Sequence, residues 1–104
     1  MHTVEFTRLL RSAHRASGLT KAELARWFGR NYWTFLRWLE GSSPVQNRKQ
    51  VEARLLLLIE AINEGMLPLS DNIHLKDRDR AIGKALNAIK HHKRMAAHHV
   101  DRTT

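Results

Sequence analysis

Residues 19–41, which read LTKAELARWFGRNYWTFLRWLEG, decide the fold that the sequence predicts. The stretch opens on a capping box, Thr20-Lys21-Ala22-Glu23, in which the Thr hydroxyl accepts from the third helical amide and the Glu carboxylate accepts from the cap amide. A helix is therefore expected over residues 21–28. Asn31 is a suitable N-cap for a second helix, which should end at Gly41. The stretch thus predicts two short helices joined by a tight turn.

Small and apolar residues stand where these two helices must touch. Ala25 allows a close approach, and Gly29 permits the positive φ that a tight turn needs. Large apolar side chains are available to fill the space between the helices: Leu24, Phe28, Phe35 and Trp38. Together these are the requirements of a helix-turn-helix.

The remaining segments are also helical by periodicity, so the expected class is all-α: a small four- to five-helix domain followed by a basic C-terminal helix. Residues 3–17 carry apolar side chains on one helical face. A second apolar stripe runs from Val51 to Ile62 and predicts another helix, which should end at Gly65. These stripes are Phe6, Leu9, Leu10, Ala13 and Ala16, and then Val51, Leu55, Leu58, Ile59 and Ile62. We divide the chain into a helix-turn-helix domain at 1–65 and, at 66–104, a connector with a last helix at about 77–99.

Charge narrows the class of partner. The 104 residues include 18 Lys and Arg against 10 Asp and Glu, a net charge of +8, which in so small a domain favours a polyanion such as nucleic acid. The chain has no cysteine and no opening that resembles a secretory signal, and its longest apolar run, Leu55 to Ile59, is far too short to span a membrane. We expect a cytoplasmic protein with no membrane partner.

The block resembles the lambda-repressor-like, Cro-type helix-turn-helix family. The resemblance runs without a gap through Leu19, Thr20, Leu24, Ala25, Gly29, Thr34, Trp38 and Gly41. It implies a DNA-binding regulator of bacterial or phage origin, with a recognition helix at about residues 31–39 in the major groove of double-stranded DNA. Carried over residue by residue, it implies base-facing Tyr32, Trp33 and Arg37, and phosphate-facing Thr20, Lys21 and Asn31. Independently of the family, Arg30 adds positive charge at the start of the recognition helix, where helix amides attract phosphate.

The residue pattern supports part of this without the family. Positions 33, 36, 37 and 40 lie opposite the face formed by Phe35, Trp38 and Leu39, so they should meet solvent or a ligand. Arg37 has the fork that matches guanine O6 and N7. Trp33 and Leu36 depart from the polar residues that the family more often carries here. They suit thymine methyl groups and protein interfaces alike.

Three functions are therefore kept open. The first is a transcriptional regulator that binds DNA as a homodimer, and the second is a DNA-recognition subunit of higher oligomeric state, like a phage small terminase. The third is a protein-interaction module that uses Trp33 and Leu36. We expect no enzyme and no cofactor, because the chain lacks a phosphate-binding glycine loop, a G-x-S-x-G turn and an H-E-x-x-H pair.

Two further basic segments have two interpretations each. Arg8, Arg11 and Arg15 recur at roughly helical spacing and form either a phosphate-contacting stripe or a solvated face. The C-terminal tail is either a DNA-backbone arm or a solvated end. That arm would use Lys90, Lys93 and Arg94. The tail histidines are spaced a heptad apart, which is a poor arrangement for zinc, and we expect no metal site.

Overall fold

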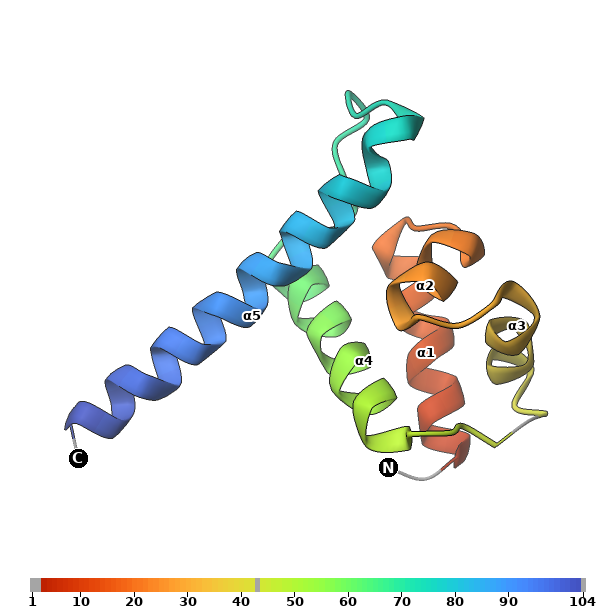
Figure 1. Ribbon diagram of the computed structural model, residues 1–104, viewed down its shortest axis with the longest axis horizontal. Helices are drawn as coiled ribbons and strands as arrows, with labels where there is room; N and C mark the ends of the chain where they lie inside the picture. Colours follow the sequence, from red (N-terminus) through yellow and green to blue (C-terminus); the bar gives the residue numbers. More distant parts are fainter. Residues whose placement is uncertain (1–2, 43, 104) are drawn as a thin grey trace.

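The computed structural model describes residues 3–42 and 44–103, and the side chains of these residues up to residue 90. Over this part of the chain the fold is all-helical, which confirms the expected class. The elements, drawn in Figure 1, are α1 (Thr3–Ser17), α2 (Lys21–Phe28), α3 (Tyr32–Glu40), α4 (Arg48–Asn63), the short 3-10 helix η1 (Leu75–Asp77) and α5 (Arg78–Thr103). None of the helices in these ranges is long and apolar enough to cross a bilayer.

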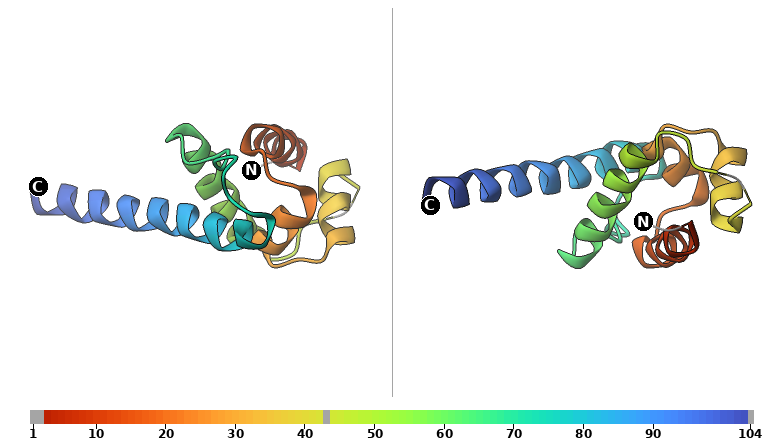
Figure 2. Two further views of the ribbon diagram at one scale, coloured as in Figure 1. Left: turned by 90° about the horizontal axis from the view of Figure 1, so that it is seen from above. Right: turned by 90° about the horizontal axis from the view of Figure 1, so that it is seen from below.

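The helices enclose one core. Helix α1 packs between α4 and α3, and α2 packs on α3, so the first four helices form a bundle of short elements (Figure 1). The first half of α5 packs on α4, and the rest of α5 extends away from the bundle (Figure 2). The largest buried side chains include Phe6, Leu10, Leu24, Phe35, Trp38, Leu55, Leu58 and Leu86. Each buried side chain of this size stabilises the fold by about 1.5–3 kcal/mol relative to exposure.

Caps set the bounds of α2 and α3, as expected from the sequence. The Thr20 hydroxyl accepts from the Glu23 amide at 3.1 Å, and Glu23 Oε1 accepts from the Thr20 amide at 2.9 Å, which completes the capping box. Helix α2 ends at Gly29, whose φ of 69° lies in the left-handed region. Asn31 Oδ1 then accepts from the Thr34 amide at 2.8 Å and begins α3.

An aromatic cluster joins α2 to α3 and to α1. The ring of Phe28 stacks on Phe35 with centroids 6.0 Å apart, and it meets Trp38 edge-on at 5.9 Å. From α1, Phe6 meets the same Trp38 ring edge-on at 6.2 Å. Ala25 is buried beside them, as the need for close approach predicts. These contacts fix the face of α3 that turns inward, and so also the face that turns outward.

Helix α5 belongs to the same core as the first four helices. Ile82, Leu86 and Ile89 are buried in the cluster that includes α1 and α4. The start of α5 is also tied to α2 by Arg78, which donates to Glu23, and by an exposed pair between Arg26 and Asp79 with a 2.8 Å contact. Helix α5 is therefore packed on the other helices from residue 78 through residue 89.

Candidate nucleic-acid interface

The outward face of α3 carries two exposed aromatic rings. Trp33 is 69% exposed and Tyr32 is 42% exposed. Their rings meet edge-on, with centroids 5.7 Å apart and planes at 77°. Residues 33, 37 and 40 are spaced by about one turn, so Arg37 and Glu40 continue the face that begins at Trp33. Both of these charged side chains are exposed.

The expectation that Leu36 also meets solvent or a ligand is wrong. Leu36 is partly buried and packs against the core cluster. It follows the core residue Phe35 directly, about 100° around the helix, and therefore lies at the border between the two faces. The outward apolar surface of α3 consequently depends on Trp33 and Tyr32.

The guanidinium of Arg37 is available to a ligand. Within the side chains that the structure describes, it forms no hydrogen bond and no ion pair. Its backbone carbonyl accepts from Gly41 and Ser42 at the end of α3, so the backbone that carries it is well held. A guanidinium presents five N–H donors in a fixed fork, which matches guanine O6 and N7 or a phosphate.

The predicted phosphate-facing residues lie at the starts of α2 and α3. Lys21 is exposed at the first position of α2, directly after its N-cap. Thr20 and Asn31 use their side-chain oxygens as caps, and each is exposed to solvent. The first amides of a helix have no acceptor within it, so both starts present N–H groups outward and favour an anion.

Arg30 is the exception among these residues. Its guanidinium donates to the Gly29 and Gln46 carbonyl oxygens, each at 3.3 Å, and lies 5.8 Å from the centroid of the Trp38 ring. This side chain therefore links the turn after α2 to the segment before α4. Its role towards phosphate stays a prediction.

His14 of α1 lies near the cations Lys21 and Arg15. The pKa of His14 lies below its usual 6.5, first because of partial burial and then because of the charges on Lys21 and Arg15. His14 is therefore neutral at pH 7 and adds no charge there. The cations themselves remain as the source of attraction for an anion.

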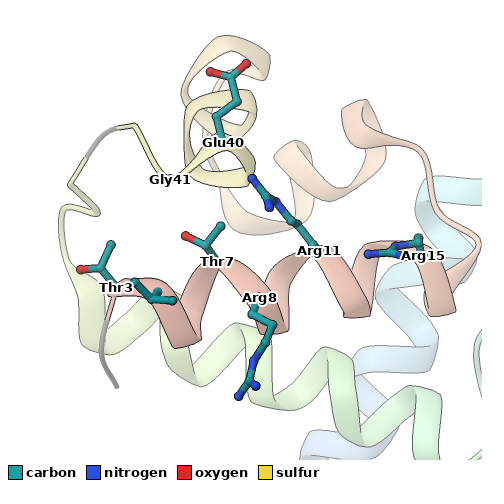
Figure 3. A pocket seen from close by; sticks show the side chains of 8 residues that line it. Thr3, Thr7, Arg8, Arg11, Arg15, Glu40 and Gly41 are labelled. Atoms are coloured by element: carbon teal, nitrogen blue, oxygen red, sulfur yellow. The ribbon is translucent and has the colours of Figure 1, made fainter.

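The three arginines of α1 border one groove, but the side chains of Arg8 and Arg11 point in different directions (Figure 3). They line a groove of about 430 Å³ between α1 and the end of α3, together with Glu40 and Gly41. Figure 3 shows that Arg11 points to α3, whereas Arg8 points the opposite way, over α4. Arg11 donates to the Leu39 carbonyl oxygen. This divergence favours the solvated-face interpretation over a continuous phosphate track.

The tail is only partly described. Lys90 is exposed, whereas the side chains of Lys93, Arg94 and the tail histidines lie outside the described residues. Among the side chains that are described, no group of three His, Asp or Glu residues could hold a metal ion. The backbone-arm prediction is therefore untested.

Two contacts escaped the sequence reasoning. Arg78 donates to both oxygens of Glu23, at 2.7 and 2.9 Å, across 55 positions of the chain. Arg54 lies 4.9 Å above the Trp27 ring and donates to the Trp27 carbonyl oxygen, so Trp27 packs on α4. Neither pair could be found from the sequence, because the partners are far apart along the chain and no local pattern joins one to the other.

Compared with protein-family models, with curated proteins and with solved structures, the chain has no match. A function must therefore be argued from the surface of α3 and the helix starts beside it.

Proposed function

We propose that α2 and α3 act as a helix-turn-helix that binds double-stranded DNA sequence-specifically, and that the protein is a transcriptional regulator that binds as a homodimer. In this proposal α3 enters the major groove with Trp33 and Arg37 towards the base edges, while Lys21 and the start of α2 meet the backbone. The resemblance to the Cro-type family supports the same assignment.

The observation that carries the proposal is the division of α3 into two faces. Phe35 and Trp38 anchor one face in the core, and the opposite face presents Arg37 with an unengaged guanidinium. A short helix held rigidly by its inner face, with a cation on its outer face, suits insertion into a groove lined by phosphates. The net charge of +8 supplies the attraction that brings the two together.

The length of α3 favours two copies on one site. Its nine residues span about 13 Å, or roughly four base steps. So few base pairs recur far too often in a genome to define one site. Two recognition helices about 34–36 Å apart on a near-palindromic sequence would supply the missing information.

The test is selection of bound sites from random duplex DNA, followed by binding of the recovered duplex with light scattering on the same sample. Arg37→Ala should weaken binding to the selected site by about 5- to 150-fold, corresponding to about 1–3 kcal/mol, and should relax preference at one guanine. Lys49→Ala, which removes an exposed cation near the start of α4, is the matched control.

Failure to enrich any sequence would refute the proposal. Equal losses of DNA affinity for Arg37→Ala and Lys49→Ala would show that α3 does not contact the bases of the selected site. Scattering that reports eight or more subunits would replace the homodimer with a ring-forming recognition subunit.

A further inference from the structure

Attraction between charges does not explain why a large apolar ring lies on the outer face of α3. Trp33 is 69% exposed, more than any other aromatic side chain that the structure describes. Phosphate oxygens offer no apolar surface, so a contact with phosphate alone would leave most of the indole uncovered. Trp33 and Tyr32 together form a small exposed aromatic patch, which a partner with an apolar group of its own would cover.

Tyr32 restrains this ring. The two aromatic planes lie at 77° with centroids 5.7 Å apart, an edge-to-face geometry that favours one orientation of the indole. The start of α3 is held in turn by the Asn31 cap. A ring ordered before binding loses less conformational entropy when it is covered. The arrangement is thus that of a fixed apolar contact surface.

The major groove presents one apolar group among its base edges, the C5 methyl of thymine. Arg37 lies four residues after Trp33 on the same face, with its guanidinium unengaged. Four residues advance about 6 Å along a helix, which is close to two base steps of about 3.4 Å. A helix aligned with the groove would place the two side chains over base pairs about two steps apart.

We propose that Trp33 recognises the 5-methyl group of a thymine, about two base pairs from the guanine that Arg37 contacts. This inference rests on the proposed DNA binding and adds a base preference to it. A protein partner is the competing occupant. DNA is favoured because the face continues into Arg37 and the chain carries a net charge of +8, which outweigh the one carboxylate on the same face, that of Glu40.

The experiment uses the duplex recovered by selection from random DNA, with each thymine replaced in turn by deoxyuridine, which removes only the methyl group. The wild-type protein should lose about fourfold in affinity at one position, the effect of exposing one methyl-sized group. Trp33→Ala should bind the thymine and deoxyuridine duplexes equally. Trp33→Phe keeps an apolar ring and should keep most of the difference.

Folding is controlled by thermal unfolding of each variant and by Leu56→Ala. Leu56 is a half-exposed apolar residue on α4, and its replacement should leave the methyl response unchanged. Because Trp33 contributes little to the core, the stability of Trp33→Ala should match that of the wild type.

The outcomes separate the two proposals. If selection enriches a site but no deoxyuridine position affects the wild type, or Trp33→Ala keeps the full methyl response, the thymine contact is overturned and DNA binding stands. If Trp33→Ala binds DNA like the wild type but loses a protein complex, the ring belongs to a protein interface and the inference fails. If no site is enriched, the proposed function itself fails.

Discussion

The Glu23 carboxylate joins three segments of the chain, and its protonation should weaken all of them. It accepts from the Thr20 amide at the start of α2 and from Arg78 at the start of α5. Arg78 also donates to the Gly18 carbonyl oxygen at the end of α1. Hydrogen bonds from Arg78 lower the pKa of Glu23 from its usual 4.5 to about 2, against the opposing effect of burial and with a smaller contribution from the Thr20 amide.

The magnitude follows from this pKa. One pKa unit corresponds to about 1.36 kcal/mol, so the fall from 4.5 to about 2 corresponds to about 3 kcal/mol of folding free energy. Glu23 is 7% exposed and the Arg78 side chain 20%, so solvent screens the pair little. A pKa that is lower in the folded state means that the stabilisation is complete above pH 4.5. It is lost as the pH falls towards 2.

The assay is urea unfolding followed by tryptophan fluorescence between pH 7 and pH 2, for the wild type and Glu23→Gln. Glu23→Gln should lower the free energy of unfolding by about 3 kcal/mol at pH 7, and the gap should close as the pH approaches 2. Asp79→Asn is the matched control because it breaks the other ion pair between α2 and α5. Both side chains of that pair are more than half exposed, and its loss should cost less than about 1 kcal/mol.

Comparing the two profiles removes the effect of the other carboxyl groups, which titrate in both proteins. A gap that stays constant from pH 7 to pH 2 would show that charge on Glu23 is not what stabilises the fold. A loss no greater than that of Asp79→Asn would show that the buried pair contributes no more than the exposed one. Either result would refute the reasoning.

Two further predictions use matched substitutions. Gly18 and Gly29 have nearly equal φ values, 68° and 69°, so alanine at either should cost about 1–2 kcal/mol for the left-handed backbone. A Cβ at Gly18 would also lie 2.8 Å from Pro68 Cβ, so Gly18→Ala should lose about 1–3 kcal/mol more in urea unfolding, and equal losses would contradict this contact. For DNA affinity measured by fluorescence anisotropy at several salt concentrations, Lys21→Ala should reduce the log–log slope by about 0.9. Arg8→Ala, which removes the same charge from α1, should leave the slope unchanged. A smaller slope for Arg8→Ala than for Lys21→Ala would show that α1, and not the start of α2, contacts the DNA backbone.

Local chemistry explains why the first three helices could be predicted closely from the sequence. The bounds 3–17 and 21–28 agree with α1 and α2, and Asn31 begins α3 as expected. A capping box, an N-cap side chain and a glycine with positive φ act within four residues, so the signal that sets each helix end is contained in the sequence beside it. The exposure of Trp33, Arg37 and Glu40 follows in the same way from the inner face of α3, whereas their role towards DNA stays a prediction.

Contacts between distant segments could not be predicted in this way. The sequence identifies Glu23 as part of a capping box, but its ion-pair partner Arg78 lies 55 residues away. The chain contains many other arginines, and no local pattern distinguishes Arg78 from them. The directions of Arg8 and Arg11 depend on the packing of α3 and α4 around α1, which periodicity does not contain. Leu36 was misassigned because helical periodicity places it at a border, where the packing of neighbours decides burial.

The two ion pairs that join α2 to α5, Arg78–Glu23 and Arg26–Asp79, are also relevant to the proposed homodimer. Helix α5 has 26 residues and a length of about 39 Å, and its first turn is fixed to α2 by the pairs that Arg78 and Asp79 form. Two copies that bind one operator must hold their α3 helices about 34–36 Å apart. Suppose that the two copies contact each other through α5. If α5 were attached flexibly to the rest of the domain, the distance between the two α3 helices would be undefined. Because α5 is fixed to α2, and α2 packs on α3, the dimer contact would instead set that distance. The Glu23–Arg78 pair would then serve recognition as well as stability, since it would hold the segment proposed to set the spacing against the segment proposed to meet DNA.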